Sequence, residues 1–139
     1  MNNLDKSKYY IDSLNSAYSS EYADSRKYYF SIYSILNELI AEITAPEKQM
    51  FTSDYARIEF IINKYSLSEE LQNDLKSAQY FTSKFRKQAK AQCTQNEINL
   101  IAKVIVELVF SQFGAIDDDF ANNVFKLYAR AIPYQSKRK

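Results

Sequence analysis

Residues 94–114 read TQNEINLIAKVIVELVFSQFG and carry the clearest structural signal in the chain. Thr94, with Glu97 three residues later, has the spacing of a capping box, which marks the start of a helix. Gly114 stands where helices commonly end, because glycine adopts a left-handed conformation there without steric cost. The apolar residues between these signals occupy almost every side of such a helix. We therefore predict a central helix over residues 95–113 that several neighbours pack against.

Residues 104–110 of this stretch, taken alone, have the composition of a β-strand. No other segment offers a strand for them to pair with. The chain has 1 Gly and 2 Pro, and it contains no Asn-Gly or Asp-Gly pair. A β-sandwich would need turn signals about every 8–12 residues. The sequence therefore predicts an all-α fold.

Apolar residues recur at spacings of three and four on the N-terminal side of the central helix, and again after it. They predict further helices over residues 4–19, 24–43, 54–65, 66–91 and 120–131. Capping residues precede these segments, namely Asp24, Ser53, Ser66 with Glu69, and the run Asp117-Asp118-Asp119. We expect a single helical domain over residues 1–139, a bundle of five to six helices in which residues 1–3 and 135–139 are frayed.

Each predicted helix has a face that we expect to point into the core. In the first three helices these faces consist of Leu4, Tyr10 or Ile11, Leu14 and Tyr18; then Tyr29, Ile32, Tyr33, Leu36, Leu39, Ile40 and Ile43; then Tyr55, Ile58, Ile61, Ile62 and Tyr65. In the helix over residues 66–91 the face consists of Leu71, Leu75, Ala78, Phe81 or Thr82, Phe85 and Ala89.

The composition excludes most familiar catalytic and cofactor sites. The chain has no His, so catalytic triads, cysteine–histidine pairs and histidine-based zinc sites are impossible. One Gly excludes the glycine-rich loops that bind phosphates, and one Cys excludes zinc fingers, iron–sulfur clusters and an intrachain disulfide. We expect a protein that is not an enzyme and that holds no cofactor and no metal.

Charge and hydropathy bear on partners and location. The formal net charge is +1, so no global field attracts nucleic acid or an anionic membrane. The apolar run 98–110 is interrupted by Asn99, Lys103 and Glu107, which makes it unsuitable for spanning a bilayer. The N-terminus lacks the pattern of a signal peptide. With Cys93 as the single cysteine, these features favour a cytoplasmic protein.

Tyrosine is concentrated in the N-terminal third of the chain. The candidate protein-binding face consists of Tyr9, Tyr10, Tyr18, Tyr22, Tyr28 and Tyr29. Tyrosine is enriched at protein interfaces, although it also fills half-buried helix faces with its hydroxyl in water. A second interpretation is single-stranded nucleic acid, whose bases stack on tyrosine rings while neighbouring lysines pair with its phosphates. Nearby acidic residues, however, cancel the charge of these lysines.

A second candidate site is a cluster of cations at the end of the helix over residues 66–91. Its members are Lys84, Arg86, Lys87 and Lys90, and Lys76 would extend it. A phosphate-binding patch is one interpretation. The other is structural, because cations near a helix C-terminus are favoured by the helix dipole whatever the function.

Three further candidate sites have weaker support from the sequence. The run Asp117-Asp118-Asp119 lacks the spacing of a calcium loop and has an evident use at a helix start. Glu38 and Glu42 lie one turn apart, but the carboxylate-bridged metal sites of helical bundles also need histidine. Cys93 precedes a helix start, yet no histidine is present to activate it as a nucleophile.

Several segments of the first two-thirds of the chain resemble the helical N-terminal region of large bacterial superfamily-1 DNA helicases. They are residues 8–14 (KYYIDSL), 21–24 (EYAD), 28–33 (YYFSIY), 36–39 (LNEL), 55–58 (YARI) and 63–67 (NKYSL). Such regions resemble small HEPN-type domains, whose active ribonucleases carry an arginine and a histidine separated by four to six residues. Here no histidine follows Arg86, so the resemblance implies no ribonuclease activity. Helicase motifs are also absent.

The resemblance implies an accessory domain, excised or stand-alone, of a nucleic-acid-processing protein. Our leading expectation is therefore a non-enzymatic helical interaction module that binds a protein partner or other domains of the same polypeptide. Two alternatives stay open. One is a stand-alone protein-binding inhibitor, such as an immunity protein, an antitoxin or a phage counter-defence protein. The other is a nucleic-acid-binding domain that uses the cations of residues 84–90.

Overall fold

The computed structural model describes residues 2–19, 25–47, 50–51, 53–88, 90 and 93–114. In that part of the chain the structure is an all-α bundle without strands, as predicted. The elements are α1 (Asn3–Ser19), α2 (Ser25–Thr44), the short 3-10 helix η1 (Ala45–Glu47), α3 (Asp54–Lys64), α4 (Glu69–Lys87) and α5 (Gln95–Gln112). The sixth helix predicted over residues 120–131 and the cap predicted at Asp24 lie outside the described residues.

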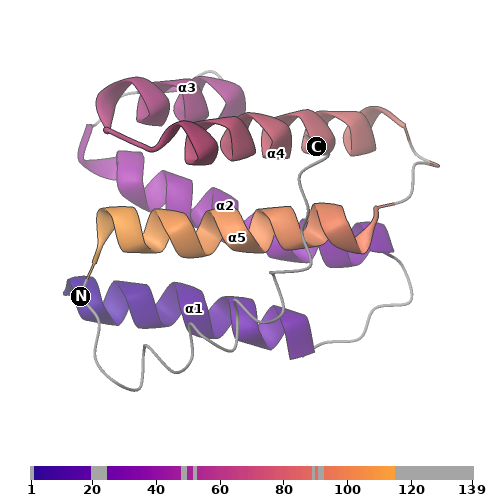
Figure 1. Ribbon diagram of the computed structural model, residues 1–139, viewed down its shortest axis with the longest axis horizontal. Coiled ribbons are helices and arrows are strands. Elements are labelled where there is room, and N and C mark those ends of the chain that lie inside the picture. The colour runs from indigo at the N-terminus through magenta and orange to yellow at the C-terminus, as the bar shows by residue number, and fades with distance from the viewer. Residues whose placement is uncertain are drawn as a thin grey trace.

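Helix α5 lies at the centre of the bundle and packs against α1, α2 and α4 (Figure 1). Its capping box is present, because Thr94 Oγ1 accepts from the Glu97 amide at 3.1 Å and the Glu97 carboxylate accepts from the Thr94 amide at 2.8 Å. Phe113 caps the other end, and Gly114 follows with a φ of 61°. The prediction of a central capped helix is confirmed.

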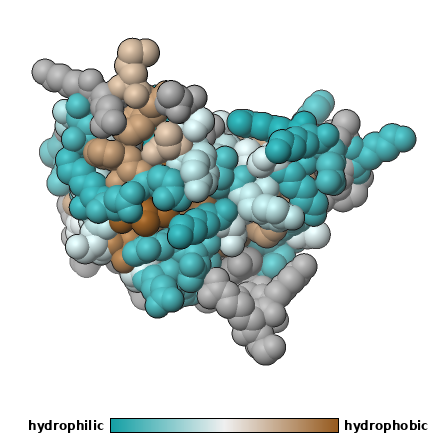
Figure 2. Space-filling view, turned by 90° about the horizontal axis from the view of Figure 1, so that it is seen from above, coloured by the Kyte–Doolittle hydropathy of each residue, from teal (hydrophilic) through white to brown (hydrophobic). Residues whose placement is uncertain are grey.

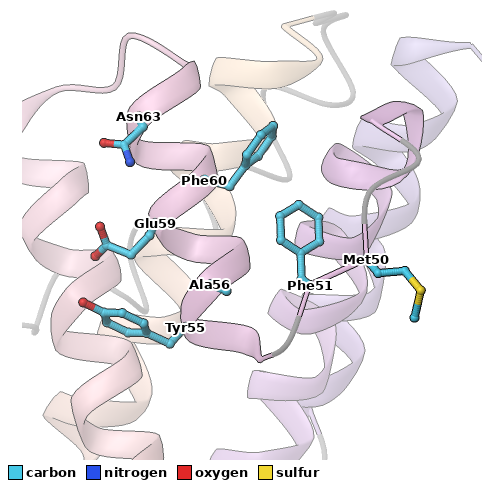
Figure 3. A pocket seen from close by; sticks show the side chains of 7 residues that line it. All are labelled: Met50, Phe51, Tyr55, Ala56, Glu59, Phe60 and Asn63. Atoms are coloured by element: carbon cyan, nitrogen blue, oxygen red, sulfur yellow. The ribbon is translucent and has the colours of Figure 1, made fainter.

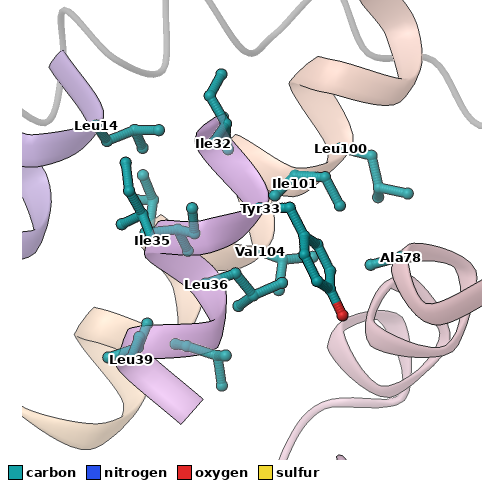
Figure 4. Packing of buried hydrophobic residues seen from close by; sticks show 14 of the residues in the cluster. Leu14, Ile32, Tyr33, Ile35, Leu36, Leu39, Ala78, Leu100, Ile101 and Val104 are labelled. Atoms are coloured by element: carbon teal, nitrogen blue, oxygen red, sulfur yellow. The ribbon is translucent and has the colours of Figure 1, made fainter. Parts of the chain in front are cut away.

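The core forms where α2 and α5 meet (Figure 4). All seven residues predicted to face inward on α2 are buried, which are Tyr29, Ile32, Tyr33, Leu36, Leu39, Ile40 and Ile43. They pack with Leu100, Ile101 and Val104 of α5, with Leu14 of α1 and with Ala78 of α4. On α4 the structure resolves one alternative, since Thr82 is buried and Phe81 is only half-buried.

The ends of α4 differ from the prediction. The helix begins after Ser68, whose side chain accepts from the Leu71 amide at 3.1 Å, and not after Ser66. Leu67 is only 8% exposed, so the chain stays extended through this segment to bring that side chain into the core. The helix ends at Lys87, four residues before the predicted end, because the backbone at Gln88 is extended.

Two smaller expectations are also wrong. Tyr55 was expected to face inward, but α3 lies at the edge of the bundle and contacts α2 and α4 through Ile58 and Ile61, which leaves Tyr55 54% exposed. Asn2 is not frayed either, because its side chain accepts from the Asp5 amide at 2.8 Å and caps α1.

Candidate functional site

Two of the six tyrosines predicted to form a binding face are not at the surface. Tyr10 and Tyr29 are 1% and 0% exposed, so both belong to the core and not to a surface. Tyr9 is 43% exposed and Tyr28 is half-buried. Tyr22 and the side chain of Tyr18 lie outside the described residues. The correction has a physical cause: successive residues of a helix are about 100° apart around its axis, so when Tyr9 faces solvent its neighbour Tyr10 turns into the core.

The tyrosines of α1 connect that helix to two glutamates of α2. Tyr9 donates to Glu38 Oε1 at 2.6 Å, and Tyr10 donates to Glu42 Oε1 at 3.2 Å. Lys6 lies 3.7 Å from the other oxygen of Glu42. Burial, followed by the charge of Glu42, raises the pKa of Tyr10 well above its ordinary value. The two glutamates therefore join α1 to α2.

The predicted cation cluster is divided by the geometry of α4. Lys84, Arg86 and Lys87 lie in the last turn of the helix, whereas Lys90 lies beyond its end. Lys84 and Lys87 share one side of α4, and Arg86 lies on another side because successive residues are about 100° apart around the axis. Arg86, Lys87 and Lys90 are exposed, and Lys84 is partly covered. The cluster is therefore not a single four-residue patch.

A surface groove that the sequence analysis did not single out lies on α3 and the segment that leads into it (Figure 3). It has a volume of about 460 Å³. We call it the aromatic groove, and it is lined by Met50, Phe51, Tyr55, Ala56, Glu59, Phe60 and Asn63. Met50 is 96% exposed, which is unusual for a large apolar side chain.

Ring contacts hold the groove in shape. Phe51 and Phe60 meet edge to face with their centroids 5.3 Å apart. The guanidinium of Arg57 lies 5.8 Å from the Phe51 ring, and the ammonium of Lys64 lies 5.6 Å from the Phe60 ring. Lys64 also pairs with Glu47 of η1, which anchors the end of α3 to the end of α2. The groove is thus a preformed surface with aromatic walls and cations beside them.

Hydrophobic and hydrophilic residues are unevenly distributed over the face seen in Figure 2. Figure 2 shows that hydrophobic residues gather toward the end where α3 lies, while hydrophilic residues cover the end where α4 stops. In the sequence, the only signal for the groove is the pair Met50-Phe51 between two helices. Periodicity does not apply to such a connecting segment, so helical patterns alone could not have found it.

The described residues contain neither a membrane-spanning helix nor a cluster of metal ligands. None of the described helices combines the length and the apolar character needed to cross a membrane. Among the same residues, no group of three or more potential ligands is arranged to hold a metal ion. The predicted Asp117-Asp118-Asp119 run lies outside the described part of the chain, as does the sequence after Gly114. Cys93 is described, and its side chain is buried at 6% exposure.

No protein-family model matches the chain, and no curated protein or solved structure is significantly similar to it.

Proposed function

We propose that this chain is a non-enzymatic protein-interaction module that docks through the aromatic groove. The observation that carries the proposal is the exposure of Met50 beside three aromatic residues in a preformed concave surface. Exposed apolar patches of this kind mark interaction sites on folded proteins. Methionine, aromatic residues and arginine are also the residue types enriched at protein interfaces, and all are present here.

The lining residues favour a protein segment over a small polar ligand. The charged and amide groups of the groove, Glu59 and Asn63, lie along α3 beside Tyr55, while Met50 projects away from the connecting segment (Figure 3). This arrangement suits an apolar side chain against the rings and a polar or basic group near Glu59. The absence of histidine from the sequence supports a binding role over a catalytic one.

The partner that fits the helicase resemblance is another domain of a larger nucleic-acid-processing protein, for which this chain would be the accessory domain. The alternative partner is a separate protein that the chain inhibits. We place the interaction in the cytoplasm, because the single cysteine, Cys93, is buried and cannot form an intrachain disulfide.

Site-specific photocrosslinking tests this proposal in the native host. A photoreactive residue replaces Tyr55 in one variant and Asp12, which is exposed on α1, in a control. We expect a discrete adduct from position 55 and none from position 12. Adding Met50→Asp should remove the adduct, while Tyr80→Asp, a charge placed elsewhere on the surface, should leave it. Equal adducts from both positions, or an adduct that Met50→Asp does not affect, would refute the proposal.

Mass spectrometry of the adduct then separates the two kinds of partner. A crosslinked peptide from a helicase-type polypeptide that also contains this sequence supports the accessory domain. A reading frame that continues beyond Lys139 into a Walker A motif would support it independently. A crosslinked toxin or nuclease encoded by a different gene supports the inhibitor instead.

A further inference from the structure

The outer face of α4 carries a row of three lysines with a tyrosine among them. Lys76, Tyr80, Lys84 and Lys87 are spaced at i, i+4, i+8 and i+11, so they lie on one side of the helix. Tyr80 is 65% exposed, Lys76 and Lys87 are exposed, and Lys84 is partly covered. We call these four residues the Tyr80 stripe. It spans roughly 16 Å along the axis at 1.5 Å per residue.

The Tyr80 ring is supported from below although it faces solvent. It meets the Phe81 ring edge to face with the centroids 5.8 Å apart. Phe81 in turn stacks at 6.5 Å on Phe85, which is fully buried. The exposed ring therefore rests on a chain of aromatic contacts that ends in the core. Such support limits the side-chain entropy that a ligand would lose on stacking there.

The lysines of the stripe are not engaged by the carboxylates of the described residues. Ion pairs in that part of the chain hold Lys6, Lys64 and Lys103, but not Lys76, Lys84 or Lys87. Between residues 72 and 90 the sequence has five cations and one acid, Asp74. Asp74 is 5% exposed and its carboxylate lies 3.0 Å from the Lys103 ammonium. Within the described residues, the stripe thus presents positive charge that no carboxylate pairs with.

The helix dipole accounts for only part of this pattern. It favours cations within the last turn, and so it explains Lys84 and Lys87. Lys76 and Tyr80 lie farther from the helix end, where the effect of the dipole has faded. An exposed ring with one lysine four residues before it and another four residues after it therefore needs a separate explanation.

We propose that the Tyr80 stripe binds single-stranded nucleic acid, with one base stacked on Tyr80 and phosphates paired with Lys76, Lys84 and Lys87. A single strand of nucleic acid alternates planar bases with anionic phosphates, which matches the ring and the cations of the stripe. Every base has a face that can stack on an aromatic side chain. A length of 16 Å corresponds to about five phosphates of a stacked strand at 3.4 Å each. A duplex keeps its bases paired in the stack, and a phospholipid headgroup offers no planar ring for Tyr80. This site does not depend on the aromatic groove.

Fluorescence anisotropy with the full chain tests the proposal. The probes are labelled oligo-dT and oligo-rU of about 12 nucleotides, within the range of known single-strand site sizes. We expect binding at low salt that weakens with a slope of about −2 in log K against log salt, from three phosphate contacts at about 0.7 each. Replacing all three lysines by glutamine should bring that slope close to zero.

The stacking contact is tested separately from the charge. Tyr80→Ala should weaken binding roughly 5- to 100-fold, the range for one stacked base, and Tyr80→Trp should preserve it. Tyr55→Ala is the matched control, because it removes another exposed tyrosine and should change nothing. Circular dichroism confirms that each variant is folded, and Tyr80→Leu provides a second variant without a stacking aromatic face.

Four results would overturn the proposal. They are no binding at low salt, tighter binding to a duplex of the same length, equal affinity of wild type and Tyr80→Ala, and equal losses from Tyr80→Ala and Tyr55→Ala. If wild type and Tyr80→Ala both bind heparin as tightly as they bind the oligonucleotides, the binding is charge attraction alone. That result would also overturn the proposal. Because Met50→Asp and Tyr55→Ala alter only the aromatic groove, failure of the two proposals can be told apart.

Discussion

The hydroxyl of Tyr29 on α2 lies 3.0 Å from the hydroxyl of Thr82 on α4, and both side chains are buried. Thr82 donates to the Ala78 carbonyl at 2.9 Å, so its oxygen accepts from Tyr29. The Tyr29 hydroxyl also lies 3.4 Å from the same carbonyl. A polar bridge thus joins α2 to α4 inside the core.

We predict that the two ends of this bridge respond unequally to substitution. Thr82→Val leaves the Tyr29 donor buried with only the longer contact to Ala78, and should lower the free energy of unfolding by about 1–3 kcal/mol. Tyr29→Phe leaves the Thr82 donor satisfied, and should cost about 1 kcal/mol. Urea denaturation measures both. A double variant that costs the sum of the two would contradict a direct bond.

Alkaline pH should destabilise the fold through Tyr10 and Tyr29. Burial is the largest cause that raises the pKa of each phenol above its usual range. The unfolded chain releases these protons at about pH 10, while the folded chain holds them to higher pH. Their contribution is therefore complete below pH 10 and is lost as the pH rises above it. Circular dichroism during alkaline titration should show unfolding. In the double variant Tyr10→Phe/Tyr29→Phe, the free energy of unfolding should fall less between neutral and alkaline pH than it does in the wild type.

Lys103 should be one of the costliest charged residues to remove. Its ammonium lies 3.0 Å from Asp74 and 2.7 Å from Glu70, which joins α5 to α4. Because the Asp74 side chain is only 7% exposed, Lys103→Met leaves a buried carboxylate without its cation, at a cost of roughly 3 kcal/mol. Lys64→Met, whose pair with Glu47 is more exposed, should cost much less.

A double variant checks the explanation for Lys103. Adding Asp74→Leu to Lys103→Met removes the unpaired carboxylate and should recover part of the lost stability. If Lys103→Met costs no more than Lys64→Met, the ion pair does not hold α4 to α5.

Removing the charge of Glu107 should stabilise the fold, whereas removing the charge of Lys103 should destabilise it. Burial is the largest influence on its pKa and raises it, and Lys103 at 3.9 Å offsets this only in part. The folded state therefore disfavours the ionised carboxylate, and the full penalty applies at neutral pH. We expect Glu107→Gln to increase the free energy of unfolding at pH 7. The gain should vanish below about pH 4, where the unfolded carboxyl is also protonated. A loss of stability at pH 7 would show that the contact with Lys103 outweighs burial.

The start of α4 offers a matched pair of serines. Ser68→Ala removes the side chain that accepts from the Leu71 amide, and should cost about 1 kcal/mol. Ser66→Ala removes an exposed side chain two residues earlier and should stay within about 0.5 kcal/mol of the wild type. Thermal denaturation of both variants measures the difference. Equal losses would mean that the helix begins earlier than Ser68.

Signals that depend on neighbouring residues were predictable from the sequence. The capping box of α5 needs only Thr94 and Glu97, and the positive φ of Gly114 follows from the absence of a side chain. The buried face of α2 was also predictable, because a helical period fixes which residues share a side. These features require no knowledge of what packs against the helix.

Features that depend on distant parts of the chain could not be predicted. Ser66 and Ser68 both resemble caps, and the choice depends on Leu67 entering a core built by other helices. The sequence does not show that α3 lies at the edge of the bundle. Helical spacing alone therefore predicts, wrongly, that the Tyr55 side chain faces the core. Tyrosine is ambiguous by its nature, since its ring can be buried and its hydroxyl can be wet. The N-terminal tyrosines were therefore assigned to a surface that two of them do not reach.

The central position of α5 has a consequence for folding during synthesis. The partners of this helix, α1, α2 and α4, all precede it in the chain, so each leaves the ribosome before the element that covers its apolar face. Until residue 112 has left the ribosome, the apolar face of α2 lacks the helix that it mainly packs against. That face is therefore open to aggregation and to chaperone binding. Completion of the core is thus a late event, tied to the arrival of one helix, and premature termination before residue 95 would yield a chain with no stable fold.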